Sequence, residues 1–188
     1  DWSSDVCSSD LTLVKILERA MWLFNEGDQL IAQSNGIGNL LFNKNGQFDQ
    51  SFLEMFCSLD DSDVMSEIKR WKNHNDKVIS LLSNAILDRH LLKLKIQNEP
   101  IAEKEVEEKR KEVSTALGLS MEDTSFLVFT GIAENSLYNP HEEKINILYK
   151  DGTVRDISQV DSPLIHQHIS QPVKKFYISC NKTQKKQS

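Results

Sequence analysis

The stretch at residues 144–157, KINILYKDGTVRDI, constrains the fold of this chain more than any other. Ile145, Ile147 and Tyr149 recur at every second position, a period of two that places one apolar face on a β-strand. Asp151-Gly152 separates this run from a second one that contains Val154, and Asp-Gly between two such runs is the strongest short signal for a β-hairpin. Because an isolated pair of strands is marginal in water, the hairpin needs a partner surface from the rest of the chain.

The composition limits the class of protein. With 188 residues, 39% of them hydrophobic and 27% charged, the chain is long enough for one sizeable globular domain or two small ones. Its net charge of −6 and pI near 5.4 argue against a nucleic-acid partner. Cys7, Cys57 and Cys180 are far apart and odd in number, which favours free thiols in a reducing cytoplasm. The sequence contains no apolar run near the roughly 20 residues that span a bilayer, and no signal-peptide pattern, so no membrane partner is expected.

Residues 1–11, DWSSDVCSSDL, differ in pattern from the rest of the chain. The segment half-repeats itself, lacks an initiator Met and resembles the translation of sequencing-adapter DNA. We therefore expect an artefactual segment, with the natural N-terminal part of the protein missing. The alternative is a genuine disordered N-terminus.

Residues 12–90 are expected to be helical. A helix that Thr12 caps and Gly27 ends is apolar nearly all round, and such helices are normally buried inside a larger body. Asp60-Asp61-Ser62-Asp63 is interpreted as an N-cap, not a metal site, because no histidine accompanies it. The remaining helices are predicted at Ser51–Cys57, at residues 60–71 and from Asn75 to about residue 86, with His74 as a cap or surface residue in the last link.

Residues 91–180 are expected to form an α+β accessory domain, in which a charged helix covers one face of a small, mostly antiparallel sheet. The elements predicted are a strand at residues 91–96, the charged helix at 103–117, a buried strand at 126–129, the hairpin, a short helix at 162–169 and a closing strand at 174–180. Asn98-Glu99-Pro100 is a turn, and Gly118 ends the charged helix. The Lys-rich tail at residues 181–188 is expected to be disordered.

Residues with recognisable chemistry are few. Gly36-Ile37-Gly38 lacks the preceding strand and following Lys of a phosphate loop, so it is interpreted as a turn. His166-Gln167-His168 has no third metal ligand nearby in the sequence. The tyrosines are expected in the sheet and the terminal lysines in solvent. No residue is assigned a catalytic, cofactor-binding or metal-binding role.

An ordered series of motifs nevertheless resembles a known family. The series is Asp60-Asp61-Ser62-Asp63 before a Trp-bearing helix, LDRHLLK at residues 87–93, Asn98-Glu99-Pro100, Phe129-Thr130-Gly131 and ILYKDG at residues 147–152. It is similar to the C-terminal half of bacterial HD-domain phosphohydrolases, in their dNTP triphosphohydrolase-like branch. The resemblance implies that residues 12–90 are the end of an HD-type helical bundle.

The same resemblance implies metal-dependent phosphate-ester hydrolysis, with nucleotides as substrates and a homo-oligomeric parent. In this family a His, a His-Asp pair and a later Asp bind a divalent ion (Mn, Mg, Fe or Zn), and all lie upstream of the helix expected at Thr12. This chain contains no His-Asp dipeptide. The resemblance therefore implies a truncated, inactive fragment whose accessory domain serves subunit contact or gating of the bundle. The alternative is a non-catalytic α+β binding or oligomerisation module.

Overall fold

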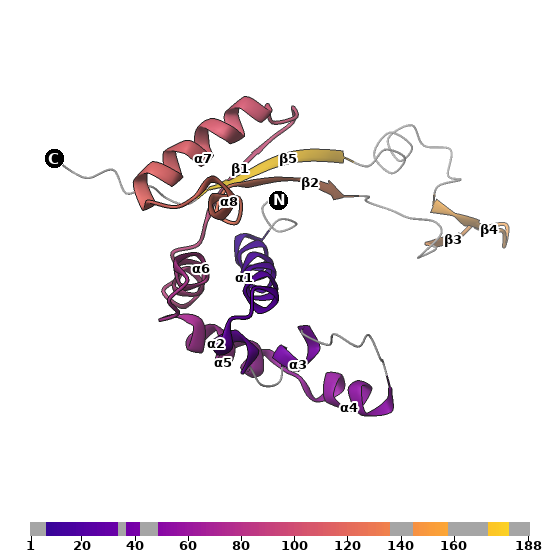
Figure 1. Cartoon of the computed structure of the whole chain (residues 1–188). Helices are drawn as coiled ribbons and strands as arrows, with labels where there is room; N and C mark the ends of the chain where they lie inside the picture. The colour runs from indigo at the N-terminus through magenta and orange to yellow at the C-terminus, as the bar shows by residue number, and fades with distance from the viewer. Residues whose placement is uncertain (1–6, 34–36, 42–48, 136–144, 158–172, 181–188) are drawn as a thin grey trace.

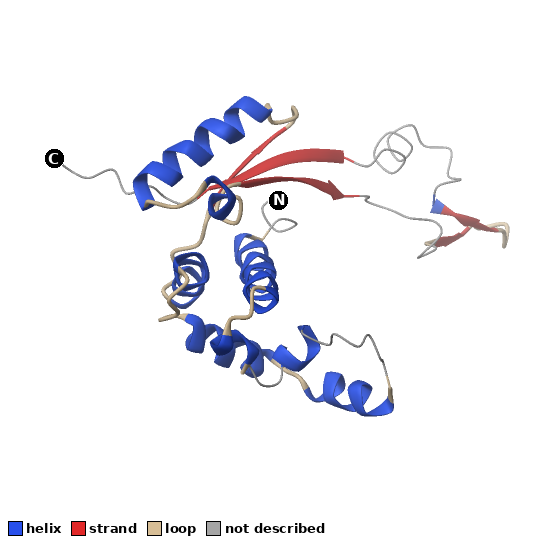
Figure 2. Cartoon of the chain, viewed as in Figure 1, coloured by secondary structure: helices blue, strands red, loops and turns tan. Residues whose placement is uncertain are grey.

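The computed structural model describes residues 7–33, 37–41, 49–135, 145–157 and 173–180, and it confirms the α+β class (Figures 1 and 2). The first half of the chain contains the helices α1 (Ser8–Asn25), α2 (Gln29–Ala32), α3 (Ile37–Leu41), α4 (Gln50–Ser58), α5 (Asp61–Trp71) and α6 (Lys77–Leu87). The second half contains β1 (Lys93–Gln97), α7 (Glu103–Leu117), α8 (Met121–Thr124), β2 (Phe129–Asn135), β3 (Asn146–Leu148), β4 (Val154–Asp156) and β5 (Val173–Cys180).

A three-stranded antiparallel sheet in the order β1-β5-β2 organises the second half. Lys95 of β1 lies opposite Ile178 of β5, and Phe129 of β2 lies opposite the next residue, Ser179. Successive residues of a strand point to opposite faces. On one face the Lys95 Nζ atom lies 2.9 Å from a carboxylate of α7, and on the other the Phe129 ring centre lies 4.7 Å from a lysine Nζ of α1. Helices α7 and α1 therefore cover opposite faces of the sheet (Figure 1).

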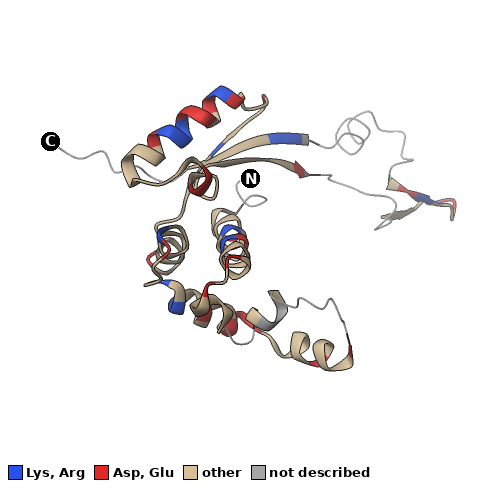
Figure 3. Ribbon diagram, viewed as in Figure 1, with Lys and Arg blue, Asp and Glu red and all other residues tan. Residues whose placement is uncertain are grey.

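Helix α7 has the bounds that the sequence predicts, and it is the charged cover of one sheet face. Acidic and basic residues are interspersed along it from Glu103 to Glu112 (Figure 3), and Val113 is its buried residue. Gly118 ends the helix with a φ of +62°, a left-handed conformation that glycine adopts without steric cost.

The hairpin forms as expected but pairs only with itself among the described residues. Strands β3 and β4 make a separate two-stranded sheet, whose turn has Gly152 at a φ of +83°. The Asp151 carboxylate accepts the Thr153 backbone N–H at 2.9 Å and stabilises this turn. Leu148 and Val154 remain 72% and 60% exposed. The larger sheet is thus centred on β5, not on the hairpin.

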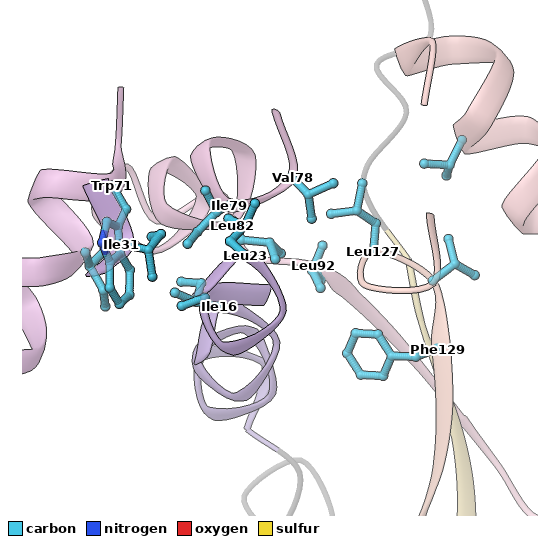
Figure 4. Close-up of a cluster of buried hydrophobic side chains, with 14 of the residues drawn as sticks. Ile16, Leu23, Ile31, Trp71, Val78, Ile79, Leu82, Leu92, Leu127 and Phe129 are labelled. Carbon is cyan, nitrogen blue, oxygen red and sulfur yellow. The ribbon is translucent and has the colours of Figure 1, made fainter. Parts of the chain in front are cut away.

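One hydrophobic cluster crosses from the helices to the sheet. Ile16 and Leu23 of α1 and Val78 of α6 belong to the same cluster as Leu92, which immediately precedes β1, and Phe129, the first residue of β2 (Figure 4). The boundary expected at residue 90 therefore lies inside a shared core. Whether residues 12–90 and 91–180 are separate domains stays a prediction.

Several predicted boundaries differ from those observed. Helix α1 begins at Ser8, four residues before the predicted Thr12. Thr12 is therefore not the cap: it is fully buried inside the helix, and its hydroxyl donates to the Ser8 carbonyl at 2.6 Å. Residues 8–11 form the first turn, and the Ser8 hydroxyl donates to the Leu92 carbonyl at 2.6 Å. That residues 1–11 are artefactual stays a prediction.

The strand predicted at residues 126–129 is also displaced. Leu127 and Val128 are buried, but they lie in a turn that follows α8, and β2 begins only at Phe129. A short apolar run does not distinguish a strand from a buried turn. Helix α6 begins at Lys77 instead of Asn75, because Asp76 is its N-cap. The helix predicted at residues 162–169 and the tail at 181–188 lie outside the described residues.

Candidate functional site

A buried arginine on α1 lies at the centre of a cluster of charged and aromatic side chains. The Arg19 side chain is 3% exposed. Its Nε donates to Asp76 Oδ1 at 3.1 Å, and its Nη2 donates to Asp76 Oδ2 at 2.6 Å, a two-point contact that fixes the guanidinium plane. The same Nη2 lies 2.8 Å from Asp123 Oδ1. Arg19 thus binds two carboxylates at once.

Two aromatic rings complete the surroundings of the guanidinium. Its carbon atom lies 4.2 Å from the ring centre of Trp22 and 5.0 Å from that of Phe126. Contacts of this kind favour a cation over the ring faces, most strongly where water is excluded.

The two carboxylates come from different parts of the fold. Asp76 is the N-cap of α6 and accepts the Ile79 backbone N–H at 2.9 Å. Asp123 belongs to α8, the short helix that leads into β2. Arg19 therefore links α1 to α6 within the helical half, and to the entry of the sheet in the other half.

The charges of this cluster stabilise one another. Burial alone would raise the pKa of Asp76, but the hydrogen bonds and charge of Arg19 and the Ile79 N–H hold that pKa below its usual range. Burial alone would lower the pKa of Arg19, but Asp76 and Asp123 raise it. Both groups are therefore ionised at neutral pH.

His74 extends the network toward α2. Its side chain is 2% exposed, so of the two predicted roles, helix cap or surface residue, the surface position is wrong. Its Nδ1 accepts the Asp76 backbone N–H at 2.9 Å, so Nε2 carries the proton and lies 3.2 Å from Asp28 Oδ1. Asp28 is in turn the N-cap of α2. The histidine joins two helix starts and acts as a structural residue.

This cluster holds charges in place but offers no reaction centre. The arginine and two paired carboxylates supply neither a nucleophile nor an open coordination site. Nowhere in the described ranges do three or more His, Cys, Asp or Glu side chains lie together as metal ligands. The described residues therefore do not fit the divalent metal that the family resemblance implies.

The residues singled out in the sequence have ordinary structural roles where they are described. Asp60 and Asp63 form a capping box at the start of α5, as predicted. Ile37 and Gly38 lie in α3, so the turn predicted there is wrong, and Gly36 lies outside the described residues. The three cysteines are free. His166 and His168 lie outside the described residues.

The Arg19 cluster was missed at the level of sequence, although a signal for it exists. Arg19 stands between Ile16, Ala20 and Leu23, on the stripe of α1 that faces the core. An arginine at such a position is almost never fully buried without a partner. Its partners Asp76 and Asp123 lie 57 and 104 residues further along the chain, and no sequence pattern around them predicts the pairing.

The fold and this cluster define an α+β protein built around a buried ionic link. No family model matches the chain, and no curated protein matches it. Among solved structures, it is similar to the crystal structure of a phosphohydrolase from Bacteroides thetaiotaomicron VPI-5482. The two share 32% sequence identity with a TM-score of 0.79, over 93% of this chain and 44% of the other.

The chain thus has a phosphohydrolase-like fold and spans less than half the length of that phosphohydrolase. None of the described helices is long and apolar enough to cross a membrane.

Proposed function

We propose that this chain is part of a metal-dependent HD-type phosphohydrolase that acts on nucleotides, in the manner of the dNTP triphosphohydrolases. The single observation that carries the proposal is the 32% identity to a phosphohydrolase across 93% of the chain. The ordered motifs from Asp60 to Gly152 supply the finer assignment to the HD type and to nucleotides.

The accessible apolar surface of α1 supports the view that the enzyme is larger than this chain. Val14 and Met21, which are seven residues apart and so lie on one stripe of the helix, are 47% and 43% exposed. Trp22 is 36% exposed. A helix of this kind normally packs against neighbours on more than one side.

In this proposal the catalytic and metal-binding residues belong to a region outside this chain. A divalent ion there would polarise the phosphoryl group and activate water. The described residues contribute a rigid body that packs against that region, with the accessory part serving subunit contact or gating. The chain alone is then inactive.

The second candidate is a non-catalytic binding or oligomerisation module. The exposed apolar side chains of the β3–β4 hairpin favour it, since such a hairpin gains stability by packing on another surface. Size-exclusion chromatography of the 188-residue chain tests this candidate, because a module of this kind should self-associate without the rest of an enzyme.

A hydrolysis panel tests the main proposal. The 188-residue chain and a longer protein that includes the upstream coding sequence of its gene are each incubated with the common dNTPs and with Mn²⁺ or Mg²⁺. We expect turnover and bound metal in the longer protein only. Turnover by the shorter chain would refute the assignment of the catalytic residues. An inactive longer protein without a His-Asp ligand set would refute the enzyme class.

A further inference from the structure

Helix α4 exposes apolar side chains to an extent that its place in the fold does not explain. None of its residues is buried, and Leu53 and Phe56 are each 52% exposed. The two are three residues apart and lie on one side of the helix, next to the exposed Cys57. Leu53, Phe56 and Cys57 together form an apolar strip on the surface of the molecule.

The helix is short for one that stands on its own. Helices below roughly 12–15 residues are marginal in water unless an apolar face packs against another element. Helix α4 has 9 residues, and Asp49 caps its start by accepting the Phe52 N–H at 2.8 Å. One cap contributes only about 1 kcal/mol, so packing on the apolar strip would add what the helix lacks.

We propose that the apolar strip of α4 is a docking surface for the rest of a longer phosphohydrolase, joined in one chain or supplied separately. This inference rests on the proposed function. The proposed occupant is a region of the longer protein. It corresponds to the part of the Bacteroides phosphohydrolase that this chain does not match, which is more than half of that protein.

The charges around the strip favour this occupant over a second copy of the chain. Residues 49–63 include five acidic residues and no basic one. Glu54, Asp60 and Asp61, which border the strip, are exposed. In a symmetric dimer the same patch faces itself, so these acids would repel one another. The strip therefore fits an apolar groove with basic side chains at its rim.

The reactivity of the Cys57 thiol measures how accessible the apolar strip is. We would label the 188-residue chain and the longer protein with a maleimide and follow each cysteine by peptide mass spectrometry. Cys57 should react rapidly in the chain alone and at least about tenfold more slowly in the longer protein, because a docked strip is reached only through local opening.

Two alanine variants of the longer protein show whether the strip itself makes the contact. Leu53→Ala combined with Phe56→Ala removes the apolar side chains but keeps a good helix former, so most of the protection of Cys57 should be lost. Ser51→Ala, at an exposed position on the side of α4 away from Leu53 and Cys57, is the matched control, for which protection should persist.

The outcomes separate this proposal from the proposed function. If the longer protein hydrolyses nucleotides while its Cys57 reacts as fast as in the chain alone, the docking surface is refuted and the enzyme assignment stands. If Cys57 is protected in a longer protein without hydrolase activity, the docking surface stands and the enzyme assignment is refuted. A dimer of the shorter chain that protects Cys57 and is dissociated by Phe56→Ala would identify a second copy as the occupant and overturn the proposal.

Discussion

Arg19 shows how a single residue ties two parts of this molecule together. It stands on the core-facing stripe of α1 and binds one carboxylate from the start of α6 and one from α8. Breaking a buried ion pair by removing one partner is far more costly than losing an exposed pair, because a charge stays behind without compensation.

The variant Arg19→Met tests the importance of this link. It keeps the apolar stem but leaves Asp76 and Asp123 unpaired, so the free energy of unfolding in urea should fall by about 2–4 kcal/mol. Glu18→Gln, which breaks the neighbouring exposed pair with Lys15, is the control and should change it by less than about 0.5 kcal/mol. An Arg19→Met protein as stable as the control would show that the link is not important for stability.

Asp76 makes the free energy of unfolding depend on pH in the acid range. Because its folded-state pKa is depressed, its contribution to stability is fully present above the unfolded pKa of about 3.9 and is lost as the pH falls through the lower folded value. The unfolding free energy should therefore decline below about pH 4, and it should decline less steeply in Asp76→Asn.

Urea titrations between about pH 6 and pH 3 measure this slope. Glu107→Gln, an exposed position on α7, serves as the control and should retain the slope of the unchanged chain. Equal slopes in Asp76→Asn and the unchanged chain would mean that other carboxylates dominate the acid response.

At the scale of elements, the contact between β2 and β5 depends on the absence of a side chain at Gly131. Gly131 lies opposite Tyr177, and a Cβ atom placed on Gly131 would collide with the Tyr177 ring and hydroxyl. Burial of that ring also raises the pKa of Tyr177. The ring therefore packs across the glycine instead of turning outward.

Gly131→Ala should force the Tyr177 ring away from the sheet and lower stability by about 1–3 kcal/mol, the usual cost of overpacking. In a Tyr177→Ala background the same substitution should cost much less, since the collision is gone. A double-mutant cycle by urea unfolding measures this coupling. Additive effects would indicate that the two residues are independent.

The elements also show what the sequence could and could not predict. Helix α7 was predicted with its observed bounds because Pro100, Gly118 and its charge pattern are local signals. The first turn of α1 was missed because residues 8–11 carry no apolar period, and their helical state depends on contacts such as that of Ser8 with Leu92. The central place of β5 and the Arg19 cluster depend on pairings between segments far apart in the sequence, which no local pattern reveals.

At the scale of the whole molecule, the shared core predicts one cooperative unit. Leu92, Leu127 and Phe129 pack in the same cluster as Ile16, Leu23 and Val78 (Figure 4). Separating the halves at residue 90 would expose both sides of that cluster to water.

Urea unfolding followed by tryptophan fluorescence and by far-UV circular dichroism should therefore give a single, coincident transition. Trp71 is fully buried in the helical half, so its fluorescence reports on that side of the core. The circular dichroism signal also includes the sheet on the other side. Two separated transitions would support the division into two domains at residue 90.

The position of β5 has a consequence for synthesis on the ribosome. Strands β1 and β2 do not pair with each other. Each pairs with β5, which is synthesised after both of them. While translation proceeds at about 5–20 residues per second, both strands therefore leave the exit tunnel with unmatched backbone edges. A nascent chain that stalls before Val173 cannot close this sheet, so ribosome pausing between β2 and β5 would prolong the exposure of two edges that invite aggregation.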